Sequence, residues 1–238
     1  MSRAIVAATM WILAGMTLLG VLYWTFLNTP ESTIVTLAAS LLLVLLMYVT
    51  TAITAAGLVL GWARGWTWAT LRRSASGLAA GILPLALVGA TSWLVGLGLA
   101  WIDGHAGEIG AWFIATFDQP DMSWLLAGVR YAGDALRFVL VPFAALVWLA
   151  QLVDRGARPL VDRATLSRAG HPLRWLAVFA VVAAAIWAPV RYGLYWMPSG
   201  LPPTWIEPAV AVVKFGVLAV VAAIGLALIG ALAARPGR

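Results

Sequence analysis

The segment VRYAGDALRF, residues 129–138, places Arg130, Asp134 and Arg137 within two helical turns beside a run of apolar residues. Helix positions i, i+4 and i+7 share one face, so Asp134 can pair with either arginine. Arg191 and Lys214 fall near the same end of two later apolar runs. These four basic residues form a candidate cationic ring, with Asp134 as its ion-pair partner.

Two interpretations of this ring remain open. Long basic side chains near the end of a membrane span can reach the headgroup region, and a neighbouring carboxylate can neutralise them, so the ring can be purely structural. Alternatively, it is a pocket at the outer leaflet that binds an anionic lipid headgroup, a phosphate or a carboxylate.

A second polar segment, WIDGHAGEIGAWFIATFDQPD, carries an imidazole and several carboxylates, but their spacing matches no specific metal site. The acids and the histidine are Asp103, His105, Glu108, Asp118 and Asp121. We expect them to be solvated, and we predict no metal and no cofactor. The other histidine, His171, is expected on the opposite side of the membrane, about 30 Å away, so the pair cannot ligate one haem.

The elements that position these residues are membrane helices. Apolar residues make up 63% of the 238 residues and charged residues 10%, whereas soluble domains carry about 25% charged residues. Several apolar runs exceed the ~20 residues that a helix needs to cross a bilayer. We predict an all-α polytopic transmembrane bundle, a single membrane domain over 1–238 with six spans arranged as three hairpins. The predicted spans are 5–27, 33–61, 76–102, 122–153, 174–195 and 208–234.

The connections between the spans alternate in charge. One side carries eleven arginines against two aspartates, a balance of +9, and the other carries four cations against seven acids, a balance of −3. Short basic loops stay in the cytoplasm, so both termini are expected there, in a multi-pass protein of a bacterial-type inner membrane. The net charge of +6 is thereby explained by topology, and nucleic acid is not an expected partner.

Small residues and prolines predict how the spans pack. Alanines recur at every fourth position of the last span, at Ala219, Ala223, Ala227 and Ala231, and Gly77 and Gly81 form a GxxxG pair. Such residues let helices approach closely, so we expect both sets to contact other helices. Kinks are expected at Pro84, Pro142 and Pro189.

Three classes of function fit this sequence. The first is a non-catalytic integral-membrane subunit or scaffold of a larger assembly, in contact with lipids and other membrane subunits. The second is a transporter or lipid-handling protein that uses the cationic ring, with Thr50, Thr51 and Thr54 as hints of a polar path. The third is an intramembrane enzyme acting on a lipid-linked substrate. Because no familiar catalytic or nucleotide-binding motif is present, an enzyme is the least favoured of the three.

Overall fold

In a computed structural model the protein is described over residues 2–30, 33–117, 123–155, 172–193 and 206–234. All regular secondary structure in these ranges is helical, which confirms the all-α prediction. Six helices are long and apolar enough to cross a membrane, which confirms a multi-pass membrane protein. Their ranges are Ser2–Leu27, Ile34–Arg64, Ile82–Gly104, Ser123–Val153, Leu173–Gly193 and Val210–Ala234.

The described chain divides into two compact units. Unit 1 comprises Met1–Ile82 and Leu146–Arg238, and unit 2 comprises Leu83–Ala145. Both boundaries fall inside helices, within α5 (Ile82–Gly104) and α8 (Val141–Arg155), and not in linkers. The single membrane domain stays a prediction.

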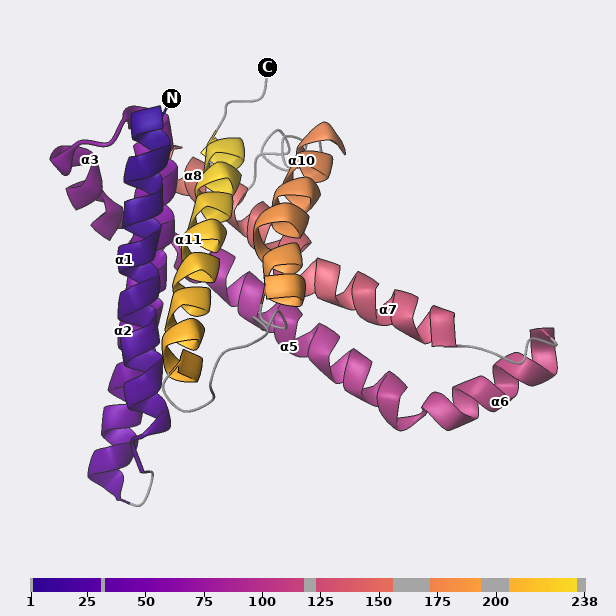
Figure 1. Ribbon diagram of the computed structural model, residues 1–238. Helices are drawn as coiled ribbons and strands as arrows, with labels where there is room; N and C mark the ends of the chain where they lie inside the picture. Colours follow the sequence, from indigo (N-terminus) through magenta and orange to yellow (C-terminus); the bar gives the residue numbers. More distant parts are fainter. Residues whose placement is uncertain (1, 31–32, 118–122, 156–171, 194–205, 235–238) are drawn as a thin grey trace. The chain divides into compact units, whose positions relative to one another are not determined.

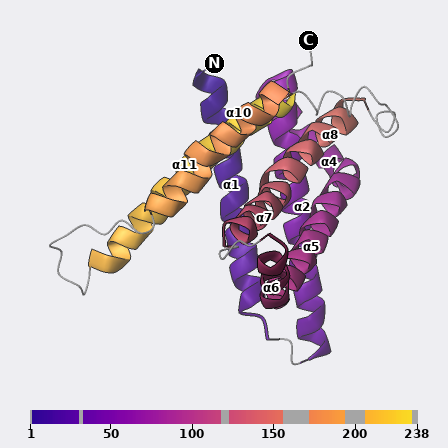
Figure 2. The ribbon, with the colours of Figure 1, turned by 90° about the vertical axis from the view of Figure 1, so that its right-hand side faces the viewer.

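The first hairpin, in unit 1, consists of α1 (Ser2–Leu27) and α2 (Ile34–Arg64), which lie side by side in Figures 1 and 2. Thr33 caps α2 through a reciprocal hydrogen-bond pair with Thr36. The Trp11 ring lies against Gly57, and its Nε1 donates to the Thr54 carbonyl over 2.9 Å. The glycine is therefore what allows an indole to fit between the two helices.

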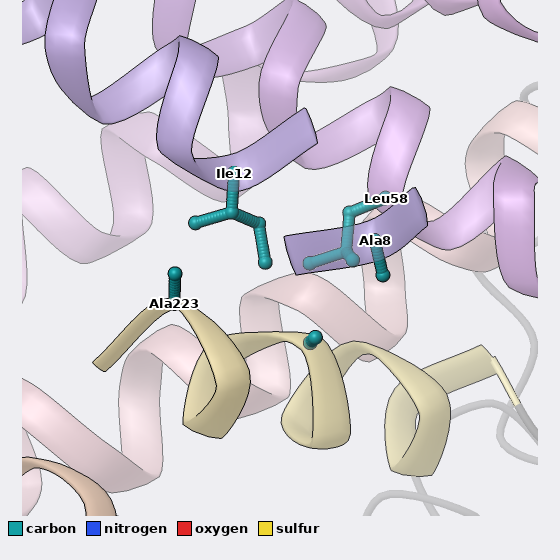
Figure 3. Packing of buried hydrophobic residues seen from close by; sticks show 5 residues of the cluster. Ala8, Ile12, Leu58 and Ala223 are labelled. Carbon is teal, nitrogen blue, oxygen red and sulfur yellow. The ribbon is translucent and has the colours of Figure 1, made fainter. Parts of the chain in front are cut away.

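The last hairpin pairs α10 (Pro172–Val182) and its continuation with α11 (Ile206–Ala234). Gly225 faces Ala185, and Gly193 faces Leu218, so the two helices run antiparallel. The alanine face of α11 turns to the first hairpin. Ala223 and Ala227 are fully buried in one cluster with Ala8, Ile12 and Leu58 (Figure 3). This confirms the predicted helix contact at its two central alanines, and Ala219 and Ala231 are partly buried.

A folded connection leads from α2 to the third span. Gly65, at φ 91°, ends α2, and Thr67 caps α3 (Trp68–Arg73). The chain then returns along α2 through η1 (Ser74–Ser76) and α4 (Gly77–Ala80). Gly77 packs against Ala56, and the Tyr48 hydroxyl donates to the Leu78 carbonyl over 2.6 Å. The contact predicted for Gly77 is thus confirmed.

Each of the three prolines coincides with an irregularity where a kink was expected. The helix breaks at Gly81, three residues before Pro84, so the third span starts at residue 82 and not at 76. Wide π turns, η2 (Leu136–Leu140) and η4 (Ala183–Trp187), precede Pro142 and Pro189, and η5 (Pro189–Gly193) begins at the latter. A proline ring clashes with the carbonyl four residues earlier, and a wide turn relieves that clash.

Unit 2 contains α5 beyond Ile82, α6 (Ala106–Phe117), α7 (Ser123–Ala135), η2 and the start of α8. Three contacts show that α5 runs antiparallel to α7 and η2. Asp103 meets Arg130, Leu99 meets Gly133, and Gly96 meets Arg137. This antiparallel pair, joined by α6 (Figure 2), completes the three predicted hairpins.

Candidate functional site

The predicted cationic ring draws its members from both units. Arg130 on α7 and Arg137 on η2 belong to unit 2, whereas Arg191 on η5 and Lys214 on α11 belong to unit 1. The gathering of all four into one ring stays a prediction. Within unit 2, the contacts of Arg130 and Arg137 define the geometry of the candidate site.

Arg130 forms an ion pair with Asp103 on the preceding span. Its Nη2 lies 2.6 Å and its Nε 3.1 Å from Oδ1 of Asp103. Both side chains are about half exposed, at 57% and 47%, and exposed pairs of this kind contribute only ~0.2–1 kcal/mol. The pair therefore fixes the register of α5 against α7 more than it stabilises the fold.

Sequence reasoning missed Asp103 as this partner. The two residues are 27 positions apart, and Asp134 was the only acid named as a partner for Arg130, although another acid on the same side of the membrane was also considered for Arg137. Pairing α5 and α7 as a hairpin would have indicated this ion pair. In such a hairpin Asp103, the last acid of one span, lies opposite Arg130, the first cation of the next. A pair between Asp134 and Arg137 stays a prediction.

Arg137 lies deeper in the same hairpin. It is seven residues past Arg130, about 10 Å along the helix axis. A Cβ placed on Gly96 would lie 3.7–3.8 Å from Nη2, Cζ and Nη1 of Arg137, so the guanidinium covers the bare backbone of that glycine. Its Cζ is 5.1 Å from the centroid of the Phe138 ring.

The Nε of Arg137 is buried and has no hydrogen-bond partner among the residues that the structure describes. The side chain as a whole is only partly buried. Arg137 is therefore a cation inside a span, with its guanidinium against the backbone of Gly96.

The remaining polar candidates are occupied locally. His105 Nδ1 lies 2.8 Å from the Trp101 carbonyl oxygen, and the imidazole stacks on the Trp101 ring at 4.6 Å. Thr50 and Thr51 donate to carbonyls four residues earlier in α2, which weakens the hint of a polar path. Within the described part of the chain, no three His, Asp or Glu side chains are grouped to hold a metal ion. Asp118 and Asp121 lie outside the described residues.

The hairpin thus combines an ion pair that sets its register with a deeper arginine seated on glycine. Such an arrangement can neutralise or bind an anion, and it carries no group that marks a particular reaction. No protein-family model, no curated protein and no solved structure matches this chain.

Proposed function

We propose that this chain is a non-catalytic integral-membrane subunit or scaffold of a larger assembly in the inner membrane. Its α5–α6–α7 segment is the element that contacts a transmembrane helix of another subunit. The observation that carries this proposal is that these three helices have very few buried residues. Of the residues described in α5, α6 and α7, only Pro84 is buried.

Exposed apolar side chains can face either lipid or another protein, so they do not show which of the two covers these helices. Exposed glycines do distinguish the two. No described residue comes within 4 Å of a Cβ built on Gly89 or Gly98 of α5. A glycine that faces lipid weakens its helix and gains nothing, whereas one that faces a helix permits close approach. These open glycines therefore favour a protein neighbour on α5.

Purification of the full chain from its native membrane in a mild detergent tests this proposal. We expect a second integral-membrane protein to co-purify in a fixed ratio. Cross-linking in the membrane before extraction is the control for a partner that detergent removes. If cross-linking captures no second protein and the purified chain is a monodisperse monomer or homo-oligomer, the proposal is contradicted.

The topology is also proposed here, with both termini in the cytoplasm. The charge balance of +9 against −3 supports it, as does the start of α1 at the same end of unit 1 as the finish of α11 (Figure 1). Reporter fusions after residues 30, 65, 110, 160, 200 and 238 are expected to alternate, with the 65, 160 and 238 fusions cytoplasmic. Two successive fusions on the same side contradict the six-span arrangement.

A second candidate function is the handling of anionic lipids at the outer leaflet, and the unsatisfied Nε of Arg137 favours it. A charge within a span costs about 3 kcal/mol on insertion scales. Arg137→Met keeps an unbranched stem over Gly96 and removes that charge. We therefore expect an unchanged or higher midpoint of thermal unfolding, together with a roughly tenfold loss of phosphatidylglycerol retention in native mass spectrometry, the effect of one charge-assisted contact.

Arg72→Met, on exposed α3, is the control for loss of one positive charge, and its lipid retention should match that of the unaltered chain. A lower unfolding midpoint for Arg137→Met with unchanged lipid retention assigns Arg137 a purely structural role. That result removes the second candidate.

A further inference from the structure

The short helix α6 joins α5 and α7 at one end of unit 2. It begins after a corner at His105, where the imidazole stacks on the Trp101 ring at 4.6 Å. Figure 1 shows α6 turned away from the axis of α5. None of its 12 residues is buried, so the described part of the chain does not cover this helix.

The length of α5 determines the depth at which α6 begins. α5 has 23 residues, about 35 Å along its axis, which exceeds the ~30 Å thickness of a hydrocarbon core. The half-exposed ion pair of Asp103 with Arg130 lies at the end of α5 next to α6, as expected where a span leaves the hydrocarbon. α6 itself has 12 residues, about 18 Å, and is too short to cross the core. These lengths put α6 at the level of the lipid headgroups.

The two sides of α6 differ in chemistry. Glu108, Trp112 and Thr116 are spaced four residues apart, so they share one side. The opposite side carries only glycine and apolar residues, which are Gly110, Phe113, Ile114 and Phe117. Ile114 and Phe117 are each about half exposed. A short helix of this kind fits a membrane surface, where its apolar side enters the acyl boundary and its polar side faces water.

Exposed tryptophans surround α6 at the same end of unit 2. Trp101 of α5, Trp112 of α6 and Trp124 of α7 are each more than half exposed. The ring of Trp124 also lies 6.4 Å from that of Phe113, so the start of α7 packs against α6. Indole rings favour the headgroup level because they combine an apolar body with a polar N–H group. Three such rings from three successive helices indicate lipid, and not bulk water, around α6.

We propose that α6 is an interfacial helix that lies on the surface of the leaflet next to Asp103, the outer leaflet in the proposed topology. Ile114 and Phe117 face the acyl chains, and Glu108 faces water. The inference depends on α5 as a membrane span and not on the proposed subunit role. It leaves Gly89 and Gly98 of α5 available to a partner helix.

Single cysteines test the proposal without background, because the chain contains no cysteine. The full chain is placed in vesicles of phosphatidylcholine and phosphatidylglycerol, with a membrane-impermeant maleimide on both sides. Ile114→Cys and Gly110→Cys are expected to react at least about tenfold more slowly than Glu108→Cys, a factor that corresponds to ~1.4 kcal/mol and is within what burial of one large apolar side chain provides. The rate of each unfolded variant corrects for intrinsic reactivity. Since the protein alone exposes both Ile114 and Glu108, a difference between them reports the surroundings.

Equal and fast labelling at Ile114 and Glu108 places α6 in water and overturns the proposal. Equal and slow labelling overturns it as well, because neither side then faces water. Gly110→Cys keeps the test valid if Ile114→Cys fails to fold, since no described atom lies within 4 Å of a Cβ built on Gly110.

A nitroxide attached to Ile114→Cys and Gly110→Cys distinguishes lipid from protein. Oxygen dissolves in hydrocarbon, whereas a nickel complex stays in water. Frequent collisions with oxygen and rare collisions with nickel are expected for contact with lipid. Rare collisions with both reagents mean that another protein covers α6, and the lipid assignment is then wrong.

Discussion

Ala223→Leu is expected to lower the free energy of unfolding by about 1–3 kcal/mol, the usual cost of overpacking a filled core. Ala223 of α11 is fully buried where this helix packs on the first hairpin, in a cluster that includes Ile12 and Leu58 (Figure 3). The three carbons that leucine adds have no space there. For a chain of this length the loss corresponds to a decrease of roughly 2–12 °C in the thermal midpoint, measured in detergent.

Ala38→Leu is the matched control, because Ala38 is exposed on α2 and the same carbons are added there. A second pair of variants sharpens the test on α11 itself. Gly225→Ala places a Cβ 2.6 Å from that of Ala185, whereas Gly216→Ala meets nothing within 4 Å. Equal midpoints for Ala223→Leu and Ala38→Leu would mean that the alanine face of α11 meets lipid and not the first hairpin. Equal midpoints for Gly225→Ala and Gly216→Ala would mean the same for the face of α11 that turns to Ala185.

If α5 contacts the proposed partner subunit, Gly89→Leu and Gly98→Leu are expected to reduce recovery of that subunit by at least about tenfold while the chain itself remains folded. A leucine on a close helix contact forces the backbones apart, and a tenfold loss corresponds to about 1.4 kcal/mol. Among the described residues of unit 2, no atom lies within 4 Å of a Cβ built on either glycine, so the packing of this unit is untouched. Co-purification from the membrane, quantified by mass spectrometry, measures the loss.

Ala38→Leu on α2 is the control, since Ala38 is exposed and lies outside unit 2. Its partner recovery should equal that of the unaltered chain. Full recovery with the α5 variants, or a matching loss with Ala38→Leu, rules out α5 as the contact.

Much of the architecture could be predicted from the sequence because lipid leaves few choices. A chain in hydrocarbon must satisfy its backbone within helices, so long apolar runs fix the spans. Small residues such as Ala223 and Gly77 correctly marked helix contacts, since close approach depends on the absence of side-chain atoms. Pro142 and Pro189 correctly marked irregular turns.

The site was harder to predict because it depends on register between helices. Nothing in the segment around Arg130 points to Asp103, which only the antiparallel step of α5 against α7 brings within 2.6 Å. The start of the third span was also missed, because hydropathy indicated one continuous span over 76–102, whereas the helix breaks at Gly81 and α5 begins at Ile82. Hydropathy reports how long a segment is, and it does not report where the chain folds back.

The π turn over Leu136–Leu140 sets which way α7, the N-terminal part of that span, faces. One extra residue in a helical turn rotates everything beyond it by about 100° relative to a regular helix. Arg130 and the buried Phe143 lie on opposite sides of this turn. If one residue of the turn were deleted, the helix would become regular. Arg130 would then turn away from Asp103 although all the other residues stayed the same. The ion pair is therefore encoded by a count of residues as much as by its two charges, so this stretch should tolerate substitution far better than a change in length.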